Sequence, residues 1–141
     1  MKFYFSILAL SLMHASCGLV PPKYDLVCVN VGKIAVKDVN ISYSGRAFSF
    51  GILSPHAVGT RNRVDEEVSI PERANITWLT EQDGKRHKQE IVVKSKLSTG
   101  NERGALIFWI DQDRADVAWR TELQWSNTIY KELNSRSFGR Q

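Results

Sequence analysis

The sequence predicts an all-β domain, an antiparallel β-sandwich of about seven short strands in an Ig-like or small barrel-like arrangement. Three observations favour this fold. Apolar and polar residues alternate with a period of two through most of the chain. Turn signals with glycine or proline separate the alternating runs. A helical pattern is confined to the end of the chain, where we expect a short C-terminal helix. Hydrophobic residues make up 43% and charged residues 24%, which excludes disorder of the whole chain.

The start of the chain has the layout of a secretory signal peptide of 16 residues. Lys2 supplies a positive charge, and residues 3–13 form an apolar run too short to span a membrane. Small residues at 15–16 directly precede Cys17, which is similar to a bacterial lipobox, although His14 stands where an aliphatic residue is usual. We therefore expect Cys17 to be the lipidated first residue of the mature protein.

Lipidation has consequences for location. Each buried acyl methylene adds about 0.8 kcal/mol of membrane affinity, so several chains on one cysteine make a durable anchor. Gly18 occupies the position where lipoproteins of the bacterial inner membrane typically have aspartate, which favours the outer membrane, facing the periplasm. Residues 17–23 then form a stiff tether because Pro21 and Pro22 favour an extended chain. The alternative is ordinary signal cleavage, giving a soluble periplasmic protein.

The body of the domain is expected in residues 24–119. Its first strand, residues 24–31, is apolar on both faces, as in a central strand, and Cys28 in it is expected to be a small buried hydrophobe. A Cys17–Cys28 disulfide is the alternative, and it requires Cys17 not to be lipidated. Residues 39–43 and 47–53 then form a hairpin around a Ser-Gly turn.

The middle of the chain contains a second hairpin. Residues 54–62 are rich in proline, glycine and polar residues and are expected to be a loop, and a short strand in 67–70 is expected to stop at Pro71. Residues 74–80 and 86–94 alternate on either side of Asp-Gly at 83–84. This dipeptide predicts a type I′ turn, which needs positive φ at both central residues.

The last part of the body contains one continuous apolar strand. A polar loop is expected in 97–104, the apolar strand in 105–110, a turn in 111–116 and a last short strand in 117–119. Residues 120–141 form a C-terminal extension. Within it and the preceding strand, helical spacing predicts a short amphipathic helix in 119–133, which either packs on the sandwich or serves as a partner surface.

No catalytic or cofactor site is indicated. His56 and His87 have no neighbouring nucleophile, and His87 is expected to be solvated on a polar-facing stretch of its strand. No closely spaced His, Cys or carboxylate set fits zinc. The acidic residues of 111–116 lack the glycine and the distal glutamate of a calcium loop. We therefore expect no metal, no cofactor and no enzyme activity.

The charged residues suggest a protein partner. The net charge is +4 and is spread along the chain, so a nucleic-acid partner is not indicated. Clustered charges beside a loop suit electrostatic steering toward a charged protein. Exposed tryptophans would provide anchors for the same interface. The candidate partner-binding residues are Arg61, Arg63, Asp65, Asp111 and Asp113.

Several short motifs carry a resemblance to a known group of proteins. They are DVNISY at 38–43, FSFG at 48–51, ITW at 76–78, DGK at 83–85 with HK at 87–88, and EIV at 90–92. Together with the lipobox-like leader, they resemble small proteobacterial β-rich lipoproteins across residues 24–119. Some of those proteins are encoded beside type VI secretion effectors, particularly lipase effectors, and are regarded as their immunity proteins.

The resemblance implies a function without chemistry of its own. A periplasm-facing lipoprotein of this group would bind and neutralise a secreted effector of the phospholipase type, and the group offers no catalytic residues to carry over. An alternative is a structural or assembly lipoprotein of the bacterial envelope or secretion apparatus. A third possibility, an enzyme or small-ligand binder, would need a deep polar pocket that joins His56 or His87 to a carboxylate.

Overall fold

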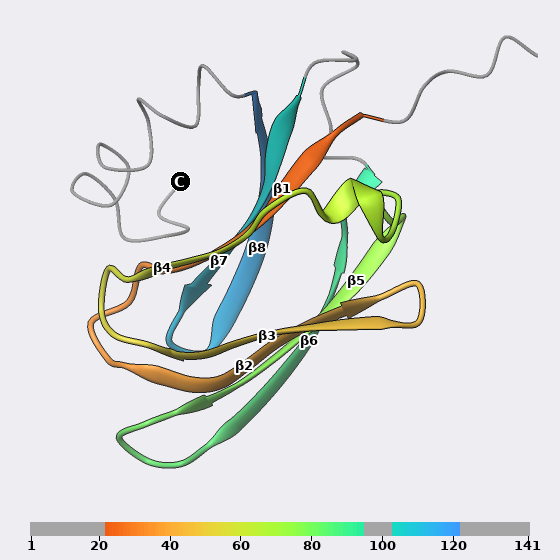
Figure 1. The fold of residues 1–141 in the computed structure, drawn as a ribbon. Helices are drawn as coiled ribbons and strands as arrows, with labels where there is room; N and C mark the ends of the chain where they lie inside the picture. The colour runs from red at the N-terminus through yellow and green to blue at the C-terminus, as the bar shows by residue number, and fades with distance from the viewer. Residues whose placement is uncertain (1–21, 95–102, 122–141) are drawn as a thin grey trace, which may run out of the picture.

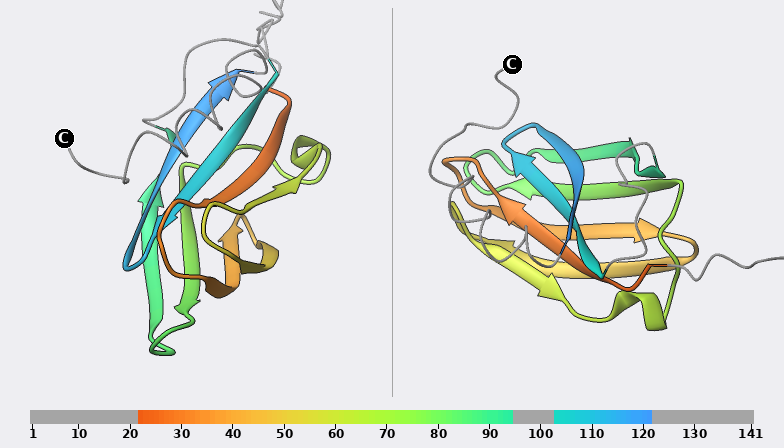
Figure 2. Two further views of the ribbon diagram at one scale, coloured as in Figure 1. Left: turned by 90° about the vertical axis from the view of Figure 1, so that its left-hand side faces the viewer. Right: turned by 90° about the horizontal axis from the view of Figure 1, so that it is seen from above.

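The computed structural model describes residues 22–94 and 103–121, in which eight β-strands form two four-stranded sheets. Sheet A has the order β4-β1-β7-β8, and sheet B has the order β3-β2-β5-β6. Figure 1 shows the two sheets as two layers, and Figure 2 shows the same layers from two further sides. The strands are β1 (Tyr24–Asn30), β2 (Val36–Tyr43), β3 (Arg46–Leu53), β4 (Val58–Arg61), β5 (Arg73–Thr80), β6 (Arg86–Val92), β7 (Gly104–Asp111) and β8 (Arg114–Thr121).

The predicted β-sandwich is confirmed, with one departure from antiparallel pairing. β1 runs parallel to β7 along its whole length, from Tyr24 beside Gly104 to Asn30 beside Ile110. All other strand pairs are antiparallel. Parallel neighbours need a long crossover connection, and here the strands of sheet B lie between β1 and β7 in the chain.

The main core lies between the sheets. Its largest fully buried side chains include Trp78 of sheet B and Tyr24 and Phe108 of sheet A. β2 and β5 alternate between buried and half-buried residues, because only one of their faces meets the core. β1 and β7 are buried almost throughout. Cys28 is a free thiol in this core, as predicted, and burial raises its pKa.

Several polar contacts join the two sheets. The hydroxyl groups of Tyr24 and Tyr43 lie 2.9 Å apart, and Trp78 Nε1 donates to the carbonyl of Gln112 at 2.7 Å. The Gln89 side chain of β6 donates to the Ala115 carbonyl at 2.6 Å and accepts from the Ala115 N–H at 2.9 Å. Through this amide, edge strand β6 of sheet B contacts edge strand β8 of sheet A much as a neighbouring strand would.

The predicted loop at residues 54–62 is wrong in its second half, because β4 pairs with β1 there. Gly59 explains how a strand fits at this edge. A Cβ atom at Gly59 would lie 2.6 Å from Phe50 Cδ1, so the missing side chain lets the Phe50 ring pack against the β4 backbone.

The short strand predicted at residues 67–70 is also wrong. A 3₁₀ helix, η1 (Val64–Glu66), precedes this segment, and the N–H groups of Glu67 and Val68 both donate to the Val64 carbonyl. These bonds satisfy the backbone locally, so no strand partner is needed. The last strand is longer than predicted, since β8 covers residues 114–121 and the turn shrinks to residues 112–113.

The hairpin between β5 and β6 exists, but the type I′ turn predicted for it is wrong. Only Gly84 of the Asp-Gly pair has positive φ, at 65°. The Gly84 N–H donates to the Thr80 carbonyl at 2.8 Å, and Asp83 Oδ1 accepts from the Lys85 N–H at 3.0 Å. The loop is therefore longer than two residues, and the Asp83 side chain stabilises it as an Asx turn.

Several sequence predictions lie outside the described residues. They are the signal peptide at 1–16, the lipidated Cys17, most of the tether, most of the polar loop at 97–104 and all of the C-terminal segment beyond residue 121. Within the described ranges, no helix has the length and apolar character needed to cross a membrane.

Candidate functional site

Three of the predicted partner-binding residues lie together at the end of sheet A where β1 begins. Arg61 is the last residue of β4 and pairs with Leu26 of β1. Arg63 precedes η1 in a left-handed conformation with φ of 55°, and Asp65 lies within η1. The turn after β4 therefore brings these charged residues close to the first residues of β1.

Arg63 and Asp65 hold this turn against β1. Asp65 Oδ1 accepts a hydrogen bond from the Tyr24 N–H at 2.9 Å, and the Arg63 N–H donates to Asp25 Oδ1 at 2.8 Å. The Arg63 guanidinium also forms an exposed ion pair with Glu66 at 2.8 Å. Part of the predicted interaction cluster thus has a structural task, which is to fix the position of η1.

Asp111 and Asp113 lie at the opposite end of sheet A. Asp111 is the last residue of β7, and Asp113 lies in the turn between β7 and β8. Asp25, near the first cluster, pairs with Ala105, which is six residues before Asp111 in β7. At about 3.3 Å per residue the two groups are about 20 Å apart, so the structure does not join them into one surface.

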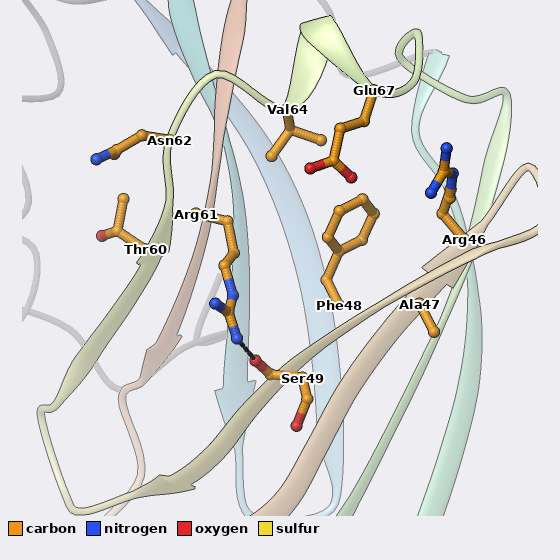
Figure 3. A pocket seen from close by; sticks show the side chains of 9 residues that line it. All are labelled: Arg46, Ala47, Phe48, Ser49, Thr60, Arg61, Asn62, Val64 and Glu67. Atoms are coloured by element: carbon orange, nitrogen blue, oxygen red, sulfur yellow. Dashed lines mark hydrogen bonds between the residues drawn. The ribbon is translucent and has the colours of Figure 1, made fainter.

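Arg61 lines a pocket of about 500 Å³ between the edge strands β3 and β4, which belong to different sheets (Figure 3). The pocket lies beside η1 and draws its walls from three segments of the chain. Its lining residues are Arg46, Ala47, Phe48, Ser49, Thr60, Arg61, Asn62, Val64 and Glu67.

The Arg61 side chain bridges the two walls. Its Nη2 donates a hydrogen bond to the Ser49 carbonyl of β3, drawn as the dashed line in Figure 3. The guanidinium carbon lies 5.9 Å from the centre of the Phe50 ring, within the range of a cation–π contact. Arg61 is therefore held in place at the junction of the two sheets.

Phe48 and Val64 form the floor of the pocket, but its accessible lining is mainly polar and its walls are charged. Phe48 and Val64 are buried in the main core, whereas Arg46, Arg61 and Glu67 are exposed. In Figure 3 the Glu67 carboxylate extends toward Phe48 and Val64. Two guanidinium groups next to apolar atoms can bind a carboxylate and the hydrocarbon portion of a neighbouring side chain.

Two buried tyrosines lie behind this floor. The Tyr43 ring centre is 5.4 Å from that of Phe48, and the Tyr24 hydroxyl group also donates to the Val68 carbonyl at 3.0 Å. Burial raises the pKa of Tyr24 to about 12, and burial together with the hydrogen bond that Tyr43 donates to the Tyr24 oxygen raises the pKa of Tyr43. Both phenols are therefore neutral at physiological pH.

One further prediction about a side chain is wrong. His87 is half-buried rather than solvated, because its ring stacks on Trp78 at 5.1 Å and its Nε2 lies 2.8 Å from Thr80 Oγ1. Trp78, Trp109 and Trp119 are all buried, so no tryptophan of the described residues is an exposed anchor. The large apolar side chains exposed in those residues are Ile52, Val58 and Val92.

Of the nine lining residues only Arg61 was predicted, and Arg46 is the second arginine among them; sequence reasoning missed it because it follows a turn glycine and has no charged neighbour in the sequence. Its place beside Arg61 follows from the packing of β3 against β4. Among residues 22–94 and 103–121, no three His, Cys, Asp or Glu side chains gather in the way a metal site requires.

Comparisons with known proteins show no family for this chain. No family model and no curated protein matches the chain. One solved structure, described as the NMR structure of the protein from Eubacterium rectale, is similar over 71% of this chain and 88% of that chain, with 15% sequence identity and a TM-score of 0.43. The function is therefore inferred from the chain's own residues.

Proposed function

We propose that the protein is an envelope-anchored immunity protein that binds and neutralises a secreted effector of the phospholipase type. The lipobox-like leader, the resemblance to immunity lipoproteins and the pocket between β3 and β4 support this function. The pocket and its rim are the proposed contact surface, with Arg46 and Arg61 as the charged anchors.

The observation that carries the proposal is the chemistry at the β3–β4 edge. Two arginines line a mainly polar pocket above Phe48 and Val64, and the same two strands expose Ile52 and Val58, with Ile52 66% exposed. Protein interfaces are enriched in arginine and aromatic residues, and their strongest contacts lie in pockets that exclude water. An acidic residue of the effector with a neighbouring apolar side chain would match this surface.

Neutralisation of this kind requires tight binding and no reaction by the immunity protein. A rigid domain can cover the active site of the effector or the face by which the effector docks on lipid. An N-terminal lipid would confine the domain to a thin layer at the membrane, which raises its effective concentration toward an effector that arrives in the same layer.

Co-expression with the effector encoded by the adjacent gene tests the proposal. The wild-type protein should protect cells, and Arg46→Glu should abolish protection and weaken binding of the purified domain at least about tenfold, which corresponds to about 1.4 kcal/mol. Arg46 suits this test because it is exposed on the rim. The matched control is Lys88→Glu, an equal charge change at an exposed position of edge strand β6.

The proposal fails if the purified domain binds no such effector and gives no protection. Protection that survives Arg46→Glu and Arg61→Glu together would retain the immunity function and reject this surface. A gene neighbourhood of secretion apparatus components without a toxin would favour the structural or assembly lipoprotein instead.

A further inference from the structure

The outer face of sheet A, which points away from sheet B, is apolar. Its side chains form a cluster separate from the main core, made of Val27, Val29, Val31, Ala105, Ile107 and Trp109. They occupy adjacent strands, because Val27 lies beside Ile107 and Val29 lies beside Trp109 in the parallel pair. The result is one continuous apolar surface on β1 and β7.

This outer face is covered. Val27, Val29, Ala105 and Ile107 have no exposed area, and Trp109 is 5% exposed. Every strand of the described residues already belongs to one of the two sheets, and sheet B packs on the opposite, inner face. Side chains at the centre of a bare sheet face would be open to water, so their cover must come from a segment beyond the strands.

We infer that residues 122–141 pack across the outer face of sheet A and form the third layer of the domain. β8 ends at Thr121, which pairs with Gly104 beside the first residue of the apolar cluster in β7. The chain continues for 20 residues from that point. A segment that leaves this edge needs only to turn back over the sheet to reach Ile107 and Trp109.

The sequence of the segment fits the surface in chemistry and in length. Its apolar residues are Leu123, Trp125, Ile129, Tyr130 and Leu133, at the loosely helical spacing noted above. As a helix, residues 123–133 would be about 16 Å long at 1.5 Å per residue. The cluster from Ala105 to Trp109 extends about 13 Å at 3.3 Å per residue. One short amphipathic helix is therefore long enough to cover it.

Thiol labelling of the outer face tests this inference. Ala105→Cys places a small thiol on the covered face, in a chain with Cys17→Ser. The introduced thiol should react slowly in the full chain and at least about tenfold faster when Leu123→Asp and Ile129→Asp are added, because opening of the cover becomes easier. The control is Ser42→Cys on the outer face of sheet B, whose reactivity should not change.

A cross-link within one chain keeps the test decisive if the double aspartate variant fails to fold. With Ala118→Cys on β8, in the outer row that contains Ile107, and Ile129→Cys in the segment, a short bifunctional maleimide should join the two thiols intramolecularly. Thr77→Cys on sheet B combined with Ile129→Cys should give no such product. Equal cross-linking to both sheets would overturn the inference.

Two other occupants of the face give distinct results. A second copy of the chain would make the thiol protection depend on protein concentration and would give a dimer in sedimentation analysis. A separate partner protein would leave the thiol of Ala105→Cys fully reactive in the purified chain. Either result overturns the assignment of residues 122–141 to this face.

Discussion

The outer faces of the two sheets carry opposite chemistry on similar four-stranded frames. On sheet A, the central row across the strands is Thr60, Val27, Ile107 and Ala118. On sheet B, the corresponding row is Ser49, Asn40, Thr77 and Lys88. A strand with two apolar faces must be covered on both, whereas alternation permits one face in water. The pattern of apolar residues in a strand therefore indicates whether one face or both faces of its sheet are covered.

The largest expected effect comes from placing a charge on each outer face. Ile107→Asp should cost at least about 4 kcal/mol of the free energy of unfolding, because Ile107 has no exposed area and the carboxylate would lose its hydration. Thr77→Asp should change it by less than about 1 kcal/mol, since Thr77 is only half-buried opposite Lys88. Urea denaturation measures both. Equal losses would mean that the two faces are equally covered.

A smaller loss is expected at the edge where the two sheets contact each other. Gln89→Ala removes both hydrogen bonds to Ala115 and leaves a partly buried N–H and carbonyl without these partners, which should cost about 2 kcal/mol. Hydrogen exchange should rise in β6 and β8 together. Lys88→Ala, which points outward from the same strand, is the control, and a loss as large as that of Gln89→Ala would contradict this role.

Alkaline pH should weaken the Tyr24–Tyr43 contact between the inner faces of the two sheets. Tyrosine in an unfolded chain has a pKa near 10. In the folded domain, burial raises the pKa of Tyr24 to about 12 and also raises the pKa of Tyr43. The neutral forms thus stabilise the fold fully below pH 10, and this contribution is lost as pH rises from 10 through 12. In that window, each buried tyrosine should lower the free energy of unfolding by about 1.4 kcal/mol per pH unit.

Urea midpoints between pH 8 and pH 12 measure this loss. Tyr43→Phe removes one of the two groups, so its stability should fall less steeply above pH 10 than that of the wild type. A decline that begins well below pH 10, or an identical slope in the variant, would contradict the assignment to the tyrosine pair.

The smallest expected effect is a gain on the polar face of sheet B. The Asn40 side-chain oxygen is buried and accepts no hydrogen bond. Asn40→Thr removes this oxygen and places a β-branched residue in β2, which should raise the free energy of unfolding by about 0.5–1 kcal/mol. Ser42→Thr on the same face is the control, because it makes a similar change in strand propensity at a residue that has no buried oxygen without a hydrogen bond. A larger gain in the free energy of unfolding for Ser42→Thr than for Asn40→Thr would contradict the reasoning.

Local sequence patterns predict where the strands of this domain lie better than they predict which strands pair. The hairpins from β2 to β3 and from β5 to β6 follow from alternation and from the glycines at 45 and 84. The parallel pairing of β1 with β7 joins residues 80 positions apart, as between Tyr24 and Gly104. No short-range signal specifies such a pair, since it depends on burying both faces of two apolar strands.

The candidate site shows the same limit. Arg61 stands out in the sequence because other charged residues surround it, but its partners in the pocket do not. Arg46 and Phe48 reach it from edge strand β3 of the other sheet. The missing side chain of Gly59, which gives Phe50 its place below Arg61, becomes meaningful only once β4 is known to be a strand.

If Cys17 carries the proposed lipid, the place of β1 in sheet A sets which end of the domain lies toward the bilayer. Tyr24, Gly104 and Thr121 lie side by side at one end of sheet A, and Arg61 lies there too, beside Leu26. Seven residues, 17–23, reach at most about 25 Å when fully extended. A molecule fastened at Cys17 would therefore keep this end of sheet A, with Arg61, within about 25 Å of the lipid headgroups. An enzyme that attacks phospholipids works at that same depth, so the two would meet directly above its substrate.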